Sequence, residues 1–351
     1  MKSALAGSFL FLSTLGWVAG QETGQDPFWK HLDGQISGTV GEFRVGGYSG
    51  ESADIDLTTK DGKVTVGKLR ITAGQNKLEL TGELTLPEAG EKIDLNRADW
   101  TMTVDARDVK AFIAQQTSQP MLGNLSVHGN IAQKEGWIQG SLEIAGTDVQ
   151  FGGVDFPGIA GAIEIERSIV QLRRLTVALP DGGSFGASGT YALKAPSAYS
   201  GTVHAEVRDL APFAALAAQF GQAWDFGGSL NLDWTGSGQR EPASHAGQGG
   251  ATLRGGRFDL FDGVDADIVG SYSPQGIEIS ELRLQTGPTE IHTGLALHDK
   301  QLRVKDLEVR QHGALVASGT ALIPLDLTQR GPLAEWVPVD AAIAIDLASR
   351  N

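Results

Sequence analysis

From Gly34 onward, apolar and polar residues alternate with a period of two through most of the chain. Clear cases are Lys63-Val64-Thr65-Val66, Lys77-Leu78-Glu79-Leu80 and Ser141-Leu142-Glu143-Ile144. Successive side chains of a strand point to opposite faces of a sheet, so this alternation predicts strands with one buried face and one wet face. The chain is therefore expected to be all-β.

Glycine-containing turn signals separate these strands. The sequence has 47 glycines among 351 residues, well above the average usage of about 7%. The positive-φ positions of tight hairpins can be supplied by Asp61-Gly62, Asp181-Gly182-Gly183, Asp262-Gly263 and Pro274-Gln275-Gly276. We predict many short strands, with consecutive strands mostly antiparallel neighbours.

Two segments without alternation, 108–116 and 209–220, are predicted to be short helices capped by Asp108 and Asp209. Their contexts also repeat, because residues 103–112 resemble residues 204–213. Landmarks about 105 residues apart are Phe43-Arg44-Val45, Val149-Gln150-Phe151 and Phe258-Asp259-Leu260. A period above about 50 residues lies outside the common solenoid units, so each repeat is expected to be a multistrand module.

The chain is divided as follows. Lys2 precedes an uncharged run over residues 3–20 that is typical of an export signal, either cleaved or retained as a membrane anchor. A polar linker over residues 21–33 follows. We predict three modules over residues 34–121, 122–227 and 228–351, the last one incomplete at its C-terminal end.

Composition argues against several classes of function. A net charge of -14 would repel a phosphate backbone, so nucleic acid is not expected as a partner. The sequence has no cysteine, which excludes disulfides and thiolate metal sites. Neither a cofactor nor a metal is expected.

Three motifs with possible chemistry are better explained by structure. Gly182–Gly186 fits G-x-S-x-G, but a strand pattern follows it where a nucleophile elbow needs a helix, so a hairpin turn is expected. Asp262, Asp265 and Asp267 lack EF-hand spacing and are interpreted as solvated turn carboxylates. His292 and His298 share strand parity but have no paired acidic residue. The chain is not expected to be an enzyme.

The apolar face of such a sheet must be covered by another layer, by its own curvature or by a bound molecule. Predicted helices are too few to cover it. Two closed solutions, a β-sandwich or a barrel with a dry core, stand beside an open solution in which an apolar groove holds ligand. The residues expected to face inward are Val64, Val66, Leu78, Leu80, Leu84, Leu86, Met102, Val104, Leu142, Ile144, Ile163, Ile165, Leu172, Leu175, Val177, Ile277, Ile279, Leu282 and Leu284.

The modules resemble those of the AsmA/TamB superfamily of bacterial envelope proteins. The similarity lies in the strands Leu80–Leu86, Ala187–Leu193 and Ala317–Ile323, and in the strand ends Ala106–Val109 and Val207–Leu210 before each predicted helix. It covers about residues 34–349. The resemblance implies an elongated, curled antiparallel β-sheet, or groove, of repeated modules with a few short helices.

The resemblance further implies a protein of the periplasm or cell envelope, anchored in the inner membrane where residues 3–20 are retained. Its expected partners are phospholipid or another acyl lipid, together with inner- or outer-membrane proteins. The expected function is phospholipid transport between membranes or outer-membrane assembly, without catalysis. The alternative is a structural or adhesive extracytoplasmic β-sandwich repeat protein with a dry core.

Overall fold

The computed structural model describes residues 33–45, 48–87, 98–109, 121–214, 226–258, 261–325 and 344–349. The predicted signal segment 1–20 and nearly all of the linker 21–33 lie outside these residues. The same holds for residues 110–116 and 215–220 of the two predicted helices.

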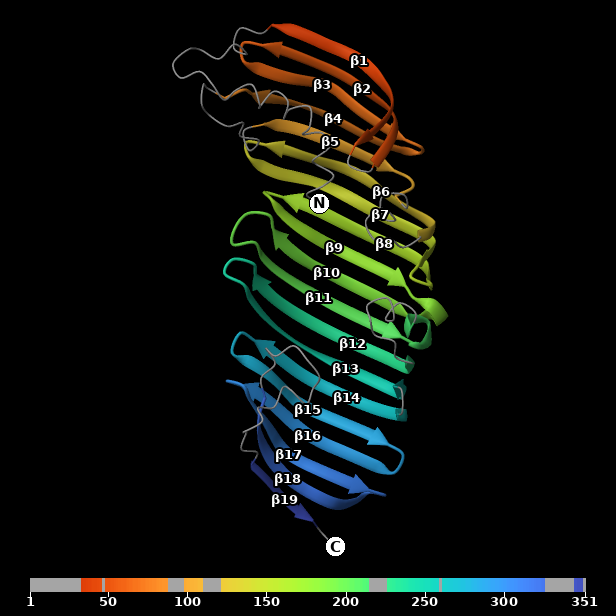
Figure 1. The fold of residues 1–351 in the computed structure, drawn as a ribbon, viewed down its shortest axis with the longest axis vertical. Helices are drawn as coiled ribbons and strands as arrows, with labels where there is room; N and C mark the ends of the chain where they lie inside the picture. The colour runs from red at the N-terminus through yellow and green to blue at the C-terminus, as the bar shows by residue number, and fades with distance from the viewer. Residues whose placement is uncertain are drawn as a thin grey trace. The chain divides into compact units, whose positions relative to one another are not determined.

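The described residues confirm the all-β prediction. They form nineteen strands in one antiparallel sheet that is not closed (Figure 1). No second sheet faces it within the described ranges, so neither of the closed solutions is the arrangement observed. Contacts divide the described chain into two compact units, one with residues 33–149 and 159–173 and the other with residues 150–158 and 174–349.

The first unit contains β1 (Gly34–Val45), β2 (Tyr48–Lys60), β3 (Lys63–Ala73), β4 (Asn76–Thr85), β5 (Asp99–Ala106), β6 (Met121–Lys134) and nearly all of β7 (Trp137–Phe151). Both units contain parts of β8 (Val154–Glu166) and β9 (Ile169–Ala178). Strands β1 to β6 pair in chain order, each antiparallel to the next.

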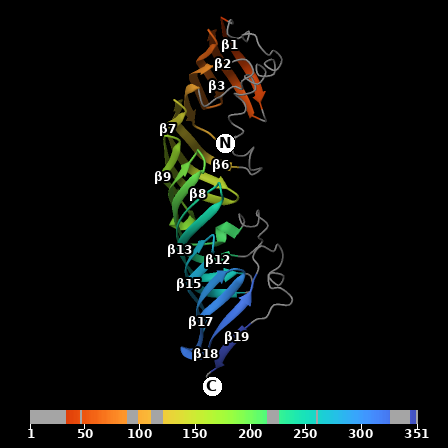
Figure 2. The ribbon, with the colours of Figure 1, turned by 90° about the vertical axis from the view of Figure 1, so that its left-hand side faces the viewer.

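The second unit contains β10 (Ser184–Ala192), β11 (Ala198–Val207), β12 (Phe226–Gln239), β13 (Ser244–Phe258), β14 (Phe261–Ser273), β15 (Gly276–Thr286), β16 (Thr289–His298), β17 (Gln301–Gln311), β18 (Ala314–Pro324) and β19 (Ala344–Ser349). These strands also pair in chain order. The described residues of this unit also form two 3₁₀ turns, η3 (Pro180–Gly182) and η4 (Ala211–Phe213). In the side view, η4 lies on one side of these strands (Figure 2).

The strands are longer than the sequence suggested. Most have between 10 and 15 residues, because a change in the phase of alternation marks a β-bulge rather than a turn. The extra residue that changes the phase is accommodated by the bulge, so the apolar residues after it point to the same face as those before it. The resulting steps of two, three and two residues place the following on one face: Val64, Val66, Leu69 and Ile71 in β3; Ile277, Ile279, Leu282 and Leu284 in β15; Leu302, Val304, Leu307 and Val309 in β17.

The predicted turns have mixed outcomes. Asp61-Gly62 is a hairpin turn in which both residues have positive φ, 51° and 70°, as expected. Pro274-Gln275 also forms a turn. The prediction for Asp262-Gly263 is wrong, because both residues belong to β14. Phe258 pairs with Phe261, so the chain reverses before Asp262.

The repeat has a counterpart in backbone geometry. The Val109 N–H donates to the Leu125 carbonyl oxygen at 3.0 Å, and the Leu210 N–H donates to the Gly228 carbonyl oxygen at 2.9 Å. Both donors follow the Arg-Asp pair that the sequence comparison aligned. Local structure therefore recurs where the sequence recurs, while the three module boundaries remain a sequence prediction.

Gly123 of β6 provides a test of how closely this strand approaches Asp148. Its φ is 86°, and an added Cβ would lie 1.9 Å from the carbonyl oxygen of Asp148. A positive φ alone costs a non-glycine residue about 1–2 kcal/mol, so we expect Gly123→Ala to lower the free energy of unfolding by about 2 kcal/mol or more. Urea unfolding followed by far-UV circular dichroism measures this loss.

The matched control is Gly38→Ala in β1, where an added Cβ meets nothing within 4 Å. It should change the unfolding free energy by no more than about 0.5 kcal/mol. Equal effects of the two substitutions would contradict the close approach of β6 to Asp148.

Candidate apolar binding site

Apolar side chains of the second unit line up across the strands on one face of the sheet. Directly paired residues of antiparallel strands point to the same face. One such row runs through Val207, Leu230, Leu253, Ala266, Leu284 and Ile291. A parallel row runs through Ala205, Leu232, Ala251, Ile268, Leu282 and Thr293. The two rows form a continuous apolar surface over β11 to β16.

A pocket of about 720 Å³ lies on this surface, within the second unit. Its thirteen lining residues come from η4, the residue before it and five consecutive strands, and none of them is charged: Leu210, Phe213, Leu230, Ala251, Leu253, Val264, Ala266, Ile268, Leu284, Gln285, Thr286, Thr289 and Ile291. This volume falls in the usual range of about 300–1,000 Å³ for small-molecule sites. Ten apolar residues give the pocket its character.

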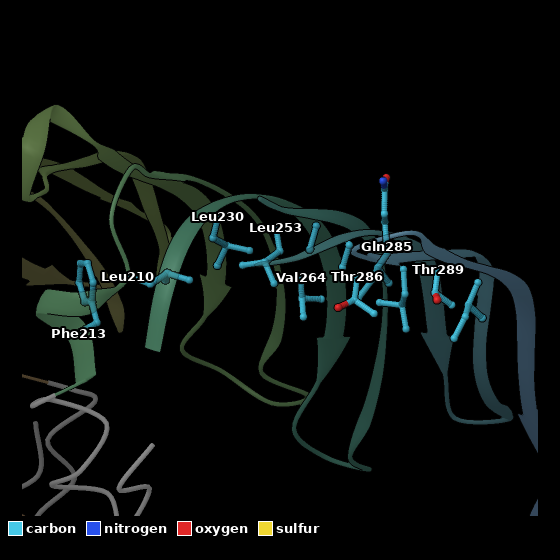
Figure 3. Close-up of a pocket in the computed structure, with 13 residues that line it drawn as sticks. Leu210, Phe213, Leu230, Leu253, Val264, Gln285, Thr286 and Thr289 are labelled. Atoms are coloured by element: carbon cyan, nitrogen blue, oxygen red, sulfur yellow. The ribbon is translucent and has the colours of Figure 1, made fainter. Parts of the chain in front are cut away.

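The labelled side chains of the pocket form an ordered series (Figure 3). Phe213 and Leu210 stand at one end, Leu230 and Leu253 follow, and Thr289 stands toward the other end. From β12 to β16 there are four strand spacings of about 4.8 Å, so this series spans roughly 19 Å. The pocket thus extends across the strands rather than along them.

A small core lies beneath η4. Leu179, Ala205 and Val207 are buried, with relative exposures of 5–8%, and Leu210 and Phe213 pack against them. Leu230 packs against the same cluster and also lines the pocket. The covered part of the apolar face therefore adjoins the hollow part directly.

Polar lining is confined to the end near β15 and β16. Thr286 pairs with Thr289 across the β15–β16 hairpin, and Leu284 precedes Thr286 by two residues, so both hydroxyls share the apolar face. Gln285 points the opposite way, away from Leu253 and Val264 (Figure 3). Among the lining side chains that point toward the pocket, the polar groups are thus two hydroxyls.

On the opposite face of the sheet, behind the pocket, Arg254 of β13 forms hydrogen bonds to β14. Its Nη2 donates to Asp267 Oδ1 at 2.7 Å, and its Nη1 donates to the carbonyl oxygens of Leu253 at 2.8 Å and Ala266 at 3.2 Å. The Arg254 hydrogen bond lowers the pKa of the Asp267 carboxyl below its ordinary value, with a further contribution from Thr252. Polar groups behind the pocket therefore join β13 to β14.

In the first unit, the predicted inward residues share one face as expected. Val64 pairs with Leu84, Leu78 with Val104, and Leu80 with Met102. Val66 lies two residues after Val64 in β3, and Leu86 follows β4, with its N–H donating to the Gly62 carbonyl oxygen at 2.8 Å. Val64 and Leu84 are buried, whereas the others are half-buried.

The remaining predicted residues lie in β7, β8, β9 and β15. Of these, Ile165 is buried and Val177 packs against the core beneath η4. Ile277 is 41% exposed. The half-buried ones are Leu142, Ile144, Ile163, Leu172, Leu175, Ile279, Leu282 and Leu284. Among all nineteen predicted residues, only Leu284 lines the pocket.

Sequence reasoning missed the part of the pocket formed by β12 to β14. The signal was present in β14, where Val264, Ala266 and Ile268 alternate with Asp265 and Asp267. The interpretation of these aspartates as turn carboxylates is wrong, because they occupy the polar positions of a strand. Asp265 Oδ1 accepts a hydrogen bond from the Gly255 N–H at 2.7 Å.

The other motifs keep their structural interpretation. Gly182 ends η3, and Ser184 begins a strand, as the hairpin interpretation of Gly182–Gly186 requires. His298 Nδ1 lies 3.2 Å from the Gln275 carbonyl oxygen. The described ranges contain no cluster of three or more histidine or acidic side chains that could hold a metal ion.

Of the two predicted helix caps, Asp209 precedes Leu210, the N-cap of η4, and its Oδ1 accepts the Ala211 N–H at 2.9 Å. Asp108 bonds through its backbone to the side chain of Asn76, and residues 110–116 of its predicted helix lie outside the described residues. Among the residues that the structure describes, no helix is both long enough and apolar enough to cross a membrane.

No family model, curated protein or solved structure matches the chain. A functional proposal for this site therefore rests on its own residues and on the sequence resemblance to the AsmA/TamB superfamily.

Removing Arg254 tests the polar side of the site. A folded-state pKa held below its unfolded value adds stability at neutral pH, and this stability is lost as pH falls through the folded pKa of Asp267. We expect Arg254→Ala to raise the pKa of Asp267 toward 3.8 and to weaken the acid-dependent loss of stability below that pH. Carboxyl ¹³C chemical shifts and urea unfolding between neutral and acidic pH measure both effects.

Arg310→Ala is the control, because Arg310 pairs with Glu308 at 3.0 Å within β17 and belongs to neither β13 nor β14. It should leave the Asp267 titration unchanged. An unaltered titration in Arg254→Ala would show that the β13–β14 ion pair does not exist in solution.

Proposed function

We propose that the chain is a non-enzymatic bacterial envelope protein that binds the acyl chain of a lipid in the pocket over β12 to β16. The observation that carries the proposal is the lining, with ten apolar residues and no charged side chain. A ligand that fits such a surface must itself be apolar along the length that is buried. An acyl chain meets this requirement and is also narrow and flexible.

The driving force would be removal of apolar surface from water. Burial contributes roughly 25 cal/mol per Å², or about 0.8 kcal/mol for each methylene group. No directional chemistry is required, which agrees with a lining whose inward-pointing polar groups are two threonine hydroxyls. A lipid headgroup would remain outside the apolar part of the pocket.

The proposed location and biological role have other support. The uncharged run over residues 3–20 after Lys2 favours export, and the AsmA/TamB resemblance favours the periplasm or cell envelope. Within that setting, an acyl-binding sheet would contribute to phospholipid transport between membranes or to outer-membrane assembly. Inner- or outer-membrane proteins are the further partners that this role requires.

Two adjacent residues of β14 allow a direct test. Ile268 lines the pocket, whereas Val269 is 47% exposed and points to the opposite face. Placing a carboxylate against a bound acyl chain should cost about 2 kcal/mol or more, so Ile268→Asp should weaken the affinity about thirtyfold or more. Displacement of the fluorescent fatty acid cis-parinaric acid by palmitate measures the dissociation constant.

Val269→Asp is the matched control and should bind like the unmodified chain. If Ile268→Asp fails to fold by circular dichroism, Ala266→Phe provides a neutral alternative that fills the pocket. Equal binding by all variants, or no binding by the unmodified chain, would refute the proposal. The second result would favour a structural or adhesive role for the open sheet.

A further inference from the structure

The pocket has a built end wall on its β12 side. Leu210 and Phe213 line the pocket and at the same time pack against Leu179, Ala205 and Val207. They therefore occupy the apolar surface next to the pocket, where a longer ligand would otherwise continue over β11. Figure 3 shows Phe213 at the extreme of the labelled lining residues.

The wall is attached to the sheet through its backbone. The Leu210 N–H donates to the Gly228 carbonyl oxygen of β12 at 2.9 Å, and the Phe213 N–H donates back to the Leu210 carbonyl oxygen at 3.0 Å. Asp209 closes the same turn through the Ala211 N–H at 2.9 Å. Three hydrogen bonds thus fix the four-residue segment 210–213 that carries both wall side chains.

The attachment point on β12 is constrained as well. Gly228 has a φ of 94°, and a Cβ there would lie 2.6 Å from the Arg254 carbonyl oxygen and 2.7 Å from the Gly255 carbonyl oxygen. Only glycine fits this close approach without strain. Strand β12, to which the wall is bonded, therefore packs closely against β13, which lines the next part of the pocket.

The opposite end differs in kind. Toward β15 and β16 the lining ends in the Thr286 and Thr289 side chains, which are small and hydroxylated. A polar ligand end can be accommodated there, whereas the Phe213 end offers only hydrocarbon. This asymmetry gives a bound chain one orientation, with its methyl end against Phe213.

We infer that Phe213, together with Leu210, is the residue that sets the longest acyl chain the pocket accepts. The inference rests on the proposed acyl binding and adds its length specificity. The site is then a bounded compartment of roughly 19 Å across four strand spacings, rather than a segment of an unbroken trough.

The experiment measures dissociation constants for saturated fatty acids of increasing length, from decanoic to docosanoic acid, by displacement of cis-parinaric acid. For the unmodified chain, each added methylene should tighten binding about fourfold until the methyl end reaches the wall, after which the gain stops. In Phe213→Ala the fourfold gain should continue for several further methylenes. Phe213→Trp should shorten the limit.

Leu232→Ala is the matched control, because Leu232 packs against the same core without lining the pocket. It should keep the length limit of the unmodified chain. If the unmodified chain binds none of the acids, acyl binding itself is refuted. If the unmodified chain binds the acids with a length limit, and all three variants (Phe213→Ala, Phe213→Trp and Leu232→Ala) keep that limit, only the end wall is refuted.

Discussion

The structure depends on a one-sided sheet whose apolar face has few described elements to cover it. In the second unit, covering is local, since η4 places Leu210 and Phe213 over the core formed by Leu179, Ala205 and Val207. Beyond that core, apolar residues of β13 to β16 line a hollow, and no second layer of described residues packs against them. The folding requirement and the candidate site are therefore two consequences of the same alternation.

Bulges allow this alternation to persist over long strands. Without the bulge that accommodates the extra residue in β15, Ile277 and Ile279 would point to the face opposite Leu282 and Leu284, because a shift of one residue reverses every side chain. The polar face would then receive two isoleucines. Three strands with the same spacing of apolar residues show that the bulge belongs to the pattern of this sheet.

The sequence predicted the class of fold better than the position of the site. Alternation, turn signals and the scarcity of helical segments were sufficient for an antiparallel all-β sheet, and most inward residues of β3 to β5 share a face as expected. Strand length was underestimated, because a bulge and a turn both interrupt a strict period of two. Pairing geometry distinguishes them, and a single sequence does not contain it.

The pocket was harder to predict for a physical reason. In β13 its lining includes the small residue Ala251, which follows two glycines and gives only a weak alternation, whereas β14 alternates clearly through Val264, Ala266 and Ile268. Large apolar residues give the strongest sequence signal, but they fill space. Part of the pocket therefore lies where the signal is weak, and one end is lined by Phe213, which lies outside the strands altogether.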